Sequence, residues 1–440
     1  MNNYVCRVIS EVKEKYPTQK EYIQAVEEVL NSISAIFDKH PEYEKMGILE
    51  DLVNPDRIIN FKVPFVNSDG VKEVYRGFRV QHNNAVGPYK GGLRFHPSVN
   101  ESIMKFLAFE QTFKNSLTTL PMGGGKGGSD FNPKGKTDEE IKRFCDAFMK
   151  ELCKYIGEGV DVPAGDLGVG AREIENLYYA YKKYKTEDEE GFITGKPVPL
   201  NGSLGRKEAT GYGLVYFLVE VLKRKPIENP RVIVSGSGNV AMYAAEKCLQ
   251  LGYKVIGMSD SNGYILDDDL DLEAIKELKE VKRASLKEYP KGTYKEGSIY
   301  DEEDLKVDIV LPCATQNEIN LERAKRLVRN GVQIVAEGAN MPNDNEAITY
   351  YKENGIVFVP GKASNAGGVS TSFLEMEQNR LHEKWSYEEV CSKLENIMKD
   401  IHKQCIEAIE EYNLDKYDYV SGANLAGASR VINEMIKNSK

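Results

Sequence analysis

Residues 231–241 read RVIVSGSGNVA, and this stretch decides the fold class. Its first four residues form an apolar strand, which runs into the pattern Gly236-x-Gly238-x-x-Ala241 and then into a helix. In such a turn the first glycine permits the sharp bend, the second lets a pyrophosphate approach the backbone, and the alanine lets the helix lie close to the sheet. The stretch therefore predicts a dinucleotide site, with phosphate bound at the helix N-terminus.

Further apolar runs alternate with helical segments after this motif. They are KVIGMSD, VDIVLPCA, VQIVAEGA and IVFVPGKA, and residues with helical spacing separate most of them. Five strand candidates with helical crossovers predict a doubly wound parallel sheet, so the fold class is α/β. We place the boundary with a preceding α/β or α+β domain near residue 200.

The other expected elements are read from periodicity and turn residues. They are N-terminal helices within 6–37, a β-hairpin of 57–66 and 71–81, helices at 102–120 and 138–155, and C-terminal helices at 390–412 and 426–438. Two glycine-dense segments, GPYKGG at 87–92 and PMGGGKGG at 121–128, are expected to be loops.

Composition limits the class of protein. A length of 440 residues leaves room for two or three domains, and 41% hydrophobic with 29% charged residues is typical of globular chains. The net charge of -10 argues against a general nucleic-acid binder, although it allows local cationic pockets for small anions. Without a long apolar run or a signal peptide, we expect a soluble, cytoplasmic protein with no membrane partner. Seven cysteines without a CxxC pair and five histidines without ligand spacing predict buried thiols and no metal site.

Three lysines and one aspartate are the strongest features of the first 200 residues. Lys90 and Lys126 lie in the glycine frames GPYKGG and GGGKGG, Lys114 lies between them, and Asp166 lies in DVPAGDLG. Glycine lets a ligand touch the backbone, and the glycine after Lys126 disfavours an ATP-type phosphate loop. Two cations can anchor a small dicarboxylate, and a third lysine crowded beside them has a lowered pKa that suits acid–base chemistry.

The residues after the second strand leave the cofactor open. Asp260 follows Gly238 by roughly 20 residues, where an acid binds the ribose 2′-OH of NAD. Against this, Ser261 and the pair Lys282-Arg283 are able to bind a 2′-phosphate, as NADP requires.

Ordered motifs along nearly the whole chain resemble those of the hexameric glutamate dehydrogenase family, in its small bacterial and lower-eukaryote form. They include GPYKGGLRFHPSV, KFLAFEQTFKNSLTTLPMGGGKGGSDF, DVPAGDLGVGAREI, LPCATQNEI and EGANMP. The resemblance implies a substrate-binding and oligomerisation domain of residues 1–200, completed by 417–440, and a Rossmann-type domain of residues 201–416, with the active site in the cleft between them. It also implies reversible oxidative deamination of L-glutamate to 2-oxoglutarate and ammonium by a homohexamer.

The same resemblance implies roles for individual residues. Lys126 is the expected catalytic lysine and Asp166 the proton-transferring acid. The expected substrate contacts are Lys90 and Ser372 at the γ-carboxylate, Gln111 and Lys114 at the α-carboxylate, and Gly165, Arg206 and Val369 around them. The expected cofactor contacts, from the glycine motif and the resemblance together, are Thr210, Gly236, Ser237, Gly238, Asn239, Val240, Asp260, Ser261, Lys282, Ala314, Thr315, Gln316, Asn340 and Asn365.

NADP is the cofactor that the resemblance favours, because NADP-using members share the Gly-Ser-Gly turn followed by Ser-Asp-Ser and a later lysine. Ser261 and Lys282 are then the candidate 2′-phosphate contacts. Use of NAD, or of both cofactors, is the alternative. Ser370 competes with Ser372 for its role, and counting back from Glu375 favours Ser372.

Two other classes are weighed against this interpretation. A dehydrogenase for leucine, valine or phenylalanine needs an apolar pocket, so the retention of Lys90 and Ser372 argues against it. A catalytically dead nucleotide-binding paralogue is expected to have lost Lys126 or Asp166, and both are present.

Overall fold

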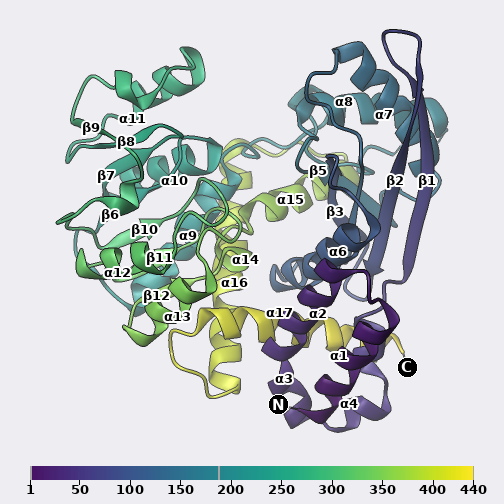
Figure 1. Ribbon diagram of the computed structural model, residues 1–440, viewed down its shortest axis with the longest axis horizontal. Coiled ribbons are helices and arrows are strands. Elements are labelled where there is room, and N and C mark those ends of the chain that lie inside the picture. The colour runs from purple at the N-terminus through teal and green to yellow at the C-terminus, as the bar shows by residue number, and fades with distance from the viewer. Residues whose placement is uncertain (1, 187–188, 440) are drawn as a thin grey trace. The chain divides into compact units, whose positions relative to one another are not determined.

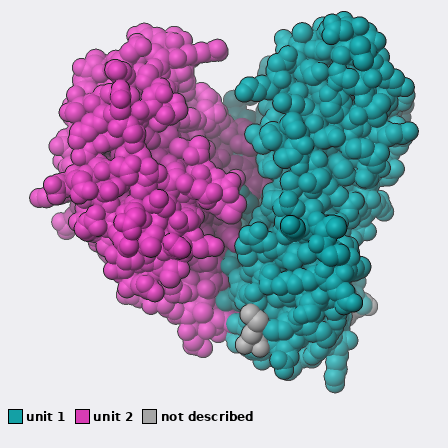
Figure 2. All heavy atoms as spheres, in the orientation of Figure 1, with its two compact units in different colours: residues 1–204, 371–390, 424–440 teal, residues 205–370, 391–423 magenta. Residues whose placement is uncertain are grey.

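The computed structural model describes residues 2–186 and 189–439, and the chain divides into two compact units. Unit 1 comprises Met1–Leu204, Thr371–Val390 and Asn424–Lys440, and unit 2 comprises Gly205–Ser370 and Cys391–Ala423. Figure 2 shows them in teal and magenta. Unit 1 thus takes in Thr371–Val390, which the sequence analysis assigned to the second domain. Each unit has its own sheet and is described by itself.

Unit 1 is built on a five-stranded sheet with the strand order β1-β2-β4-β3-β5. Figure 1 labels β1, β2, β3 and β5 of this sheet. The strands are β1 (Arg57–Val66), β2 (Lys72–Asn83), β3 (Tyr89–Phe95), β4 (Gly124–Ser129) and β5 (Asp161–Gly165). β2 is antiparallel to β1 and β4, whereas β3 is parallel to β4 and β5. The predicted hairpin is confirmed, and Asn67 Oδ1 holds its turn by accepting from the N–H groups of Asp69 and Val71.

The two glycine-dense segments supply strands, so the expectation of loops was wrong. A Cβ atom on Gly91 of β3 would lie 1.6 Å from the carbonyl oxygen of Gly125 of β4, so the two backbones meet where no side chain fits. The Arg79 side chain also runs from β2 across β4, against Gly125 and Gly127, to reach Asp161 on β5. Glycine is a poor strand former in general, but here close packing requires it.

Helices cover both faces of this sheet. On one face, α6 (Glu101–Leu117) packs its Met104 and Ala108 against Phe78 and Val80 of β2. On the other face, α7 (Asp138–Leu152) and α8 (Ala171–Tyr184) enclose a larger core that contains Phe95. The N-terminal helices are α1 (Asn3–Lys15), α2 (Lys20–Ser32), α3 (Ser34–Lys39), α4 (Glu42–Lys45) and α5 (Ile48–Leu52).

The last helix, α17 (Tyr419–Asn438), returns to unit 1 as the resemblance implied. The Ser116 hydroxyl of α6 donates to the Gly427 carbonyl at 2.9 Å, and Arg430 donates to the Ser116 carbonyl at 2.8 Å. These two bonds fix the end of the chain to the helix that carries Gln111 and Lys114.

Unit 2 contains a seven-stranded sheet with the order β12-β11-β10-β6-β7-β8-β9. Its strands are β6 (Arg231–Val234), β7 (Lys254–Ser259), β8 (Gly263–Leu266), β9 (Thr293–Glu296), β10 (Ile309–Leu311), β11 (Ile334–Ala336) and β12 (Val357–Val359). The five predicted strands are confirmed and are parallel, whereas β8 and β9 form an antiparallel extension that was not predicted. Strand order reverses between β6 and β10, which is where open α/β sheets bind ligands.

The helices of unit 2 precede, connect or follow these strands in the chain. They are α9 (Ala209–Arg224), α10 (Asn239–Gln250), α11 (Leu272–Lys276), α12 (Leu321–Arg329), α13 (Asn345–Glu353) and α14 (Gly361–Ser364). The chain passes from one unit to the other within α15 (Gly367–Leu381), α16 (Tyr387–Glu411) and α17. Within residues 2–186 and 189–439, no helix has the length and apolar character needed to cross a membrane.

Candidate functional site

Lys126 and Asp166 form a buried ion pair in unit 1. Lys126 lies in β4 with 6% of its surface exposed, and its Nζ is 3.1 Å from Oδ2 of Asp166, which directly follows β5. Arg94 of β3 donates from Nε to the same oxygen at 2.8 Å. Three neighbouring strands therefore bring two cations and one carboxylate together.

The ionisation of this group is perturbed. Burial lowers the pKa of Lys126, the charge of Asp166 opposes that effect, and the positive charges of Arg94 and Arg79 add to it. Burial by itself raises the pKa of Asp166, but the charges of Lys126 and Arg94 bring it below its ordinary value. Groups with shifted pKa values that lie together are typical of sites that transfer protons.

Lys90 is a second buried cation on the same sheet. It is 1% exposed, and its Nζ donates to Thr194 Oγ1 at 2.8 Å. Its own carbonyl accepts from Asn115 Nδ2 of α6 at 3.0 Å, and the same amide group donates to Gly123. Asn115 thereby joins α6 to the ends of β3 and β4.

The expected α-carboxylate contacts lie on α6. Gln111 and Lys114 are half-buried and three residues apart, so they share one side of the helix. Gln111 Nε2 donates to Asn115 Oδ1 at 2.6 Å, and a Cβ atom on Gly124 would clash with Thr112, so α6 lies directly against β4. Unit 1 thus brings Lys90, Lys126 and Asp166 onto one sheet beneath α6.

A fully buried ion pair that the sequence analysis did not identify supports the segment with Ser372. Lys196 Nζ is 3.0 Å from Glu375 Oε1, and both side chains are inaccessible to solvent. Glu375 also accepts from the N–H of Gly195 at 2.9 Å. Ser372 is buried one turn earlier in α15, whereas the Ser370 hydroxyl donates to the Ala366 carbonyl within the helix.

Arg206, Thr210 and Val369 belong to unit 2 and gather at the start of α9. A Cβ atom on Gly368 would lie 2.7 Å from Thr210 Oγ1 and 3.5 Å from Arg206 Nη1, so both side chains lie against the first turn of α15. Val369 is the next residue and is half-buried. Their placement relative to Gly165 and the rest of the set in unit 1 stays a prediction.

The glycine turn of unit 2 has the geometry of an anion site. Gly236 has φ +90°, and its N–H donates to Ser259 Oγ at 2.9 Å. α10 begins at Asn239 with Gly238 as its N-cap, which supplies no side-chain cap, and nothing lies within 4 Å of the place of a Cβ atom on Gly238. The first N–H groups of the helix are thus open to a phosphate, as a dinucleotide requires.

Asp260 is fully engaged within the protein. Its Oδ1 accepts from the N–H groups of Asn262 and Gly263, and its Oδ2 accepts from Leu286 N at 2.9 Å and Lys279 Nζ at 3.0 Å. Burial raises the pKa of this carboxyl, but these donors bring it below its ordinary value. Ser261 and Lys282 are exposed, on the turn and the segment that Asp260 ties together.

The remaining cofactor candidates lie after β10, β11 and β12. Ala314, Thr315 and Gln316 are exposed, and the N–H groups of the first two donate to Glu318. Asn365 donates to Asn340 Oδ1 at 2.9 Å, so these two amides form one pair. The candidates therefore follow the carboxyl ends of parallel strands, where such sheets bind nucleotides.

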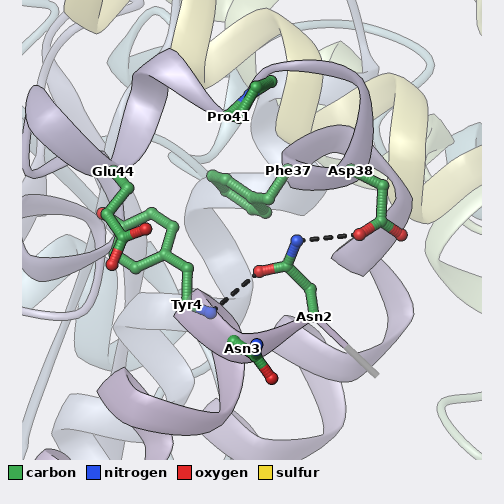
Figure 3. A pocket seen from close by; sticks show the side chains of 7 residues that line it. All are labelled: Asn2, Asn3, Tyr4, Phe37, Asp38, Pro41 and Glu44. Atoms are coloured by element: carbon green, nitrogen blue, oxygen red, sulfur yellow. Dashed lines mark hydrogen bonds between the residues drawn. The ribbon is translucent and has the colours of Figure 1, made fainter.

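Among the cavities formed by the described residues, two lie within unit 1. One, of about 330 Å³, lies among the N-terminal helices and is lined by Asn2, Asn3, Tyr4, Phe37, Asp38, Pro41 and Glu44 (Figure 3). Its lining is acidic or uncharged, so it does not suit a dicarboxylate. The other, of about 400 Å³, is lined by Asp166 together with Pro133, Lys134, Gly168, Val169, Gly170, Arg172 and Glu173. Only the second borders the candidate site.

Comparisons with known proteins match nearly the whole chain. The model of the glutamate/leucine/phenylalanine/valine dehydrogenase family matches residues 201–439, and the model of the family's dimerisation domain matches residues 55–183. The chain is 55% identical to an NAD(P)-specific glutamate dehydrogenase of Xylanibacter ruminicola, over 98% of both chains. It is 50% identical to an NADP-specific glutamate dehydrogenase of Helicobacter pylori, over 98% of this chain and 99% of that one.

A solved structure gives the same result. The chain superposes on Plasmodium falciparum glutamate dehydrogenase with a TM-score of 0.93 and 48% identity, over 99% of this chain and 94% of that one. Other relatives of similar identity are named NADP-specific or NAD-specific.

Proposed function

Because this chain belongs to the glutamate/leucine/phenylalanine/valine dehydrogenase family, we propose that it is a glutamate dehydrogenase. It would interconvert L-glutamate with 2-oxoglutarate and ammonium, and NADP would be its preferred cofactor. The observation that carries the substrate choice is the buried cation Lys90 on the same sheet as the Lys126–Asp166 pair. A buried ammonium suits the side-chain carboxylate of glutamate better than the apolar side chain of leucine, valine or phenylalanine.

The proposed chemistry divides the work between the buried groups. Lys90 and Ser372 hold the γ-carboxylate, and Gln111 and Lys114 hold the α-carboxylate. Lys126, with its lowered pKa, polarises the 2-oxo group and holds or releases a proton at Nζ. Asp166 moves protons to and from ammonia and water. NADP, when bound, accepts or supplies the hydride at the α-carbon.

The preference for NADP is supported by the saturation of Asp260. Its two oxygens already have five donors, the fifth being the Ser285 hydroxyl, and the charge of Lys279 balances its own. Asp260 is therefore poorly placed to hold a ribose 2′-OH or to repel a 2′-phosphate. Exposed Ser261 and Lys282 beside it would bind the phosphate. We expect a higher kcat/KM with NADPH than with NADH at saturating 2-oxoglutarate and ammonium, and the reverse order would contradict this assignment.

We further propose that the protein is a homohexamer in the cytoplasm. The segment matched by the dimerisation domain includes β1, an edge strand of ten residues. Ile58 and Val66 of β1 and Val74 of the adjacent β2 are exposed. Such an edge is usually covered in an assembly. The seven free cysteines agree with a reducing compartment. Light scattering should give a mass of about 300 kDa for six chains, and a mass near 49.4 kDa would exclude the assembly.

The decisive experiment on the catalytic assignment is Lys126→Ala. We expect this variant to lose turnover of 2-oxoglutarate with ammonium while it keeps NADPH binding, measured by the fluorescence of the bound cofactor. Lys142→Ala, at an exposed position on α7, is the matched control and should keep full activity. Near-normal turnover by Lys126→Ala would remove Lys126 from the mechanism.

A further inference from the structure

Arg94 occupies the strand that lies between the two members of the acid–base pair. β3 is parallel to both β4 and β5, with Leu93 opposite Gly127 on one side and Gly165 on the other. The next step in this register places Arg94 beside Asp166. A Cβ atom on Gly92 would lie 2.9 Å from Asp166 Cβ, so the aspartate lies directly over β3.

The contacts of Asp166 are divided unequally between its two oxygens. Arg94 Nε donates to Oδ2 at 2.8 Å, and Lys126 Nζ is 3.1 Å from that same atom. Both of these contacts are made to Oδ2, and the Asp166 side chain is 27% exposed, so the carboxylate is not closed off from solvent. A carboxylate can accept several protons in hydrogen bonds, so Oδ1 is the atom left to exchange one.

We propose that Arg94 is a positioning residue for proton transfer: it holds Oδ2 of Asp166 against Lys126 and thereby presents Oδ1 to ammonia and water. This inference rests on the proposed glutamate dehydrogenase function. Arg94 acts through Asp166 and Lys126 and does not itself contact the reacting atoms. The planar guanidinium suits this task because its N–H groups have a fixed geometry, unlike the rotating ammonium of a lysine.

The positive charge of Arg94 also acts on both members of the pair. Its positive charge favours the ionised form of Asp166 and the neutral form of Lys126, and both effects lower the corresponding pKa values. Removing the charge should raise both pKa values, so the acidic and basic limbs of the pH profile should move to higher pH together. A neighbouring charge at this distance changes a carboxyl pKa by about one unit or more.

Of the other described charged groups near the pair, three have partners of their own and one faces solvent. Arg79 of β2 affects Lys126 through the sheet, but it donates to Asp161 on the opposite face. Arg172 and Glu173 of α8, which line the cavity beside Asp166, bond to each other. Lys134, in the same lining, is exposed to solvent.

The experiment compares Arg94→Gln, Arg94→Lys and the control Arg143→Gln, whose arginine lies on α7 and donates to the Val66 carbonyl. We expect Arg94→Gln to lower kcat by about 10- to 100-fold and to leave the KM for NADPH unchanged. Losses of this size are usual when a group that orients a reacting side chain is removed. The variant's profile of kcat/KM against pH should move up by about one pH unit. Arg94→Lys keeps the charge, so its profile should stay in place while kcat remains reduced.

A second measurement needs no turnover. Reductive methylation by formaldehyde and cyanoborohydride, followed by peptide mass spectrometry, reports how readily Lys126 loses its proton. At pH 8 the rate at Lys126 should fall in Arg94→Gln and be unchanged in Arg143→Gln. If Arg94→Gln does not fold, Arg94→Lys decides by its kcat.

Several results would overturn the inference. They are a wild-type pH profile in Arg94→Gln, a shifted profile in Arg94→Lys, wild-type kcat in Arg94→Lys, or an unchanged methylation rate at Lys126. Failure of the proposed function is distinct, because the wild-type protein itself would then show no activity with 2-oxoglutarate, ammonium and NADPH, while the methylation rates would still test Arg94.

Discussion

Replacing Lys196 by methionine removes one member of the buried ion pair with Glu375. In the native protein the two groups are 3.0 Å apart, and Lys196 Nζ also donates to the carbonyls of Glu190 at 3.0 Å and Ile193 at 2.7 Å. The methionine side chain fills a similar volume but leaves the Glu375 carboxylate buried without its cation. The variant therefore removes the charge of residue 196 and its two donations to the carbonyls of Glu190 and Ile193, with little change in volume.

The expected loss is about 3 kcal/mol in the free energy of unfolding. Removing one partner of a buried pair usually costs about 3 to 5 kcal/mol. We expect the lower end, because Glu375 keeps the N–H donors of Gly195 and Lys196, and position 196 keeps its N–H when the side chain changes. The double variant Lys196→Met/Glu375→Gln has no buried charge. The N–H groups of Gly195 and residue 196 donate to different oxygens of Glu375, so the amide oxygen of the double variant keeps one of these two bonds. This variant should be about 2 kcal/mol more stable than Lys196→Met.

Urea unfolding followed by tryptophan emission is the assay. Trp385 is the single tryptophan of the chain and belongs to Thr371–Val390, the same part of unit 1 as Glu375. Its emission therefore reports on the unit in which the pair lies. A loss below about 1 kcal/mol in Lys196→Met, or a double variant no more stable than the single one, would refute this reasoning.

Three further outcomes are expected. Gly91→Ala should prevent unit 1 from folding, because its Cβ atom would lie 1.6 Å from the Gly125 carbonyl oxygen. The control Gly159→Ala has nothing within 4 Å of its Cβ atom and should change the free energy of unfolding by less than about 0.5 kcal/mol. Circular dichroism tests both variants. Burial lowers the pKa of His82 to about 4, whereas a histidine in an unfolded chain has a pKa of roughly 6.5. Between these pH values the unfolded state binds more protons than the native state, so the free energy of unfolding falls as the pH drops from about 6.5 to about 4. Between pH 7 and pH 4.5, His82→Phe should lose up to about 3 kcal/mol less unfolding free energy than the native protein. Urea titrations at the two pH values test this, and an equal loss in both proteins would contradict it. Lys282→Ala should lower kcat/KM for NADPH by about tenfold and leave the value for NADH unchanged, and equal losses would remove Lys282 from phosphate binding.

The Rossmann-type sheet was predictable because its signal is local. Each of its five parallel strands is a short apolar run next to a helical segment, and the glycine turn identifies the first of them. β8 was missed because its four residues follow a turn and begin with Gly263. The central strands of unit 1 were mistaken for loops because the reason for their glycines, the Arg79 side chain that crosses them, comes from a different strand.

The site residues likewise fall into those that the sequence reveals and those that only the structure reveals. Lys90, Lys126 and Asp166 were identified from glycine frames that can be seen in the sequence, and the structure brings them onto one sheet. Arg94 lies in the quoted motif GPYKGGLRFHPSV but was not identified as a site residue, and Glu375 served only to place Ser372. Their importance depends on strand register and on a contact between residues about 180 positions apart, which a single sequence does not reveal.

The path of the chain through its two units has a consequence for biosynthesis. Residues 424–440 complete unit 1, yet roughly 240 residues are translated after its first segment ends at Leu204. At about 5 to 20 residues per second, the nascent first segment would wait roughly 10 to 50 s for the helix that covers α6. During that interval the segment with Gly427 and Arg430 has not been made, so the partly made unit exposes Leu117 of α6, which the finished protein buries beside Gly427. Chaperone binding on the ribosome is therefore expected to concentrate on α6, and to end when the C-terminus is released.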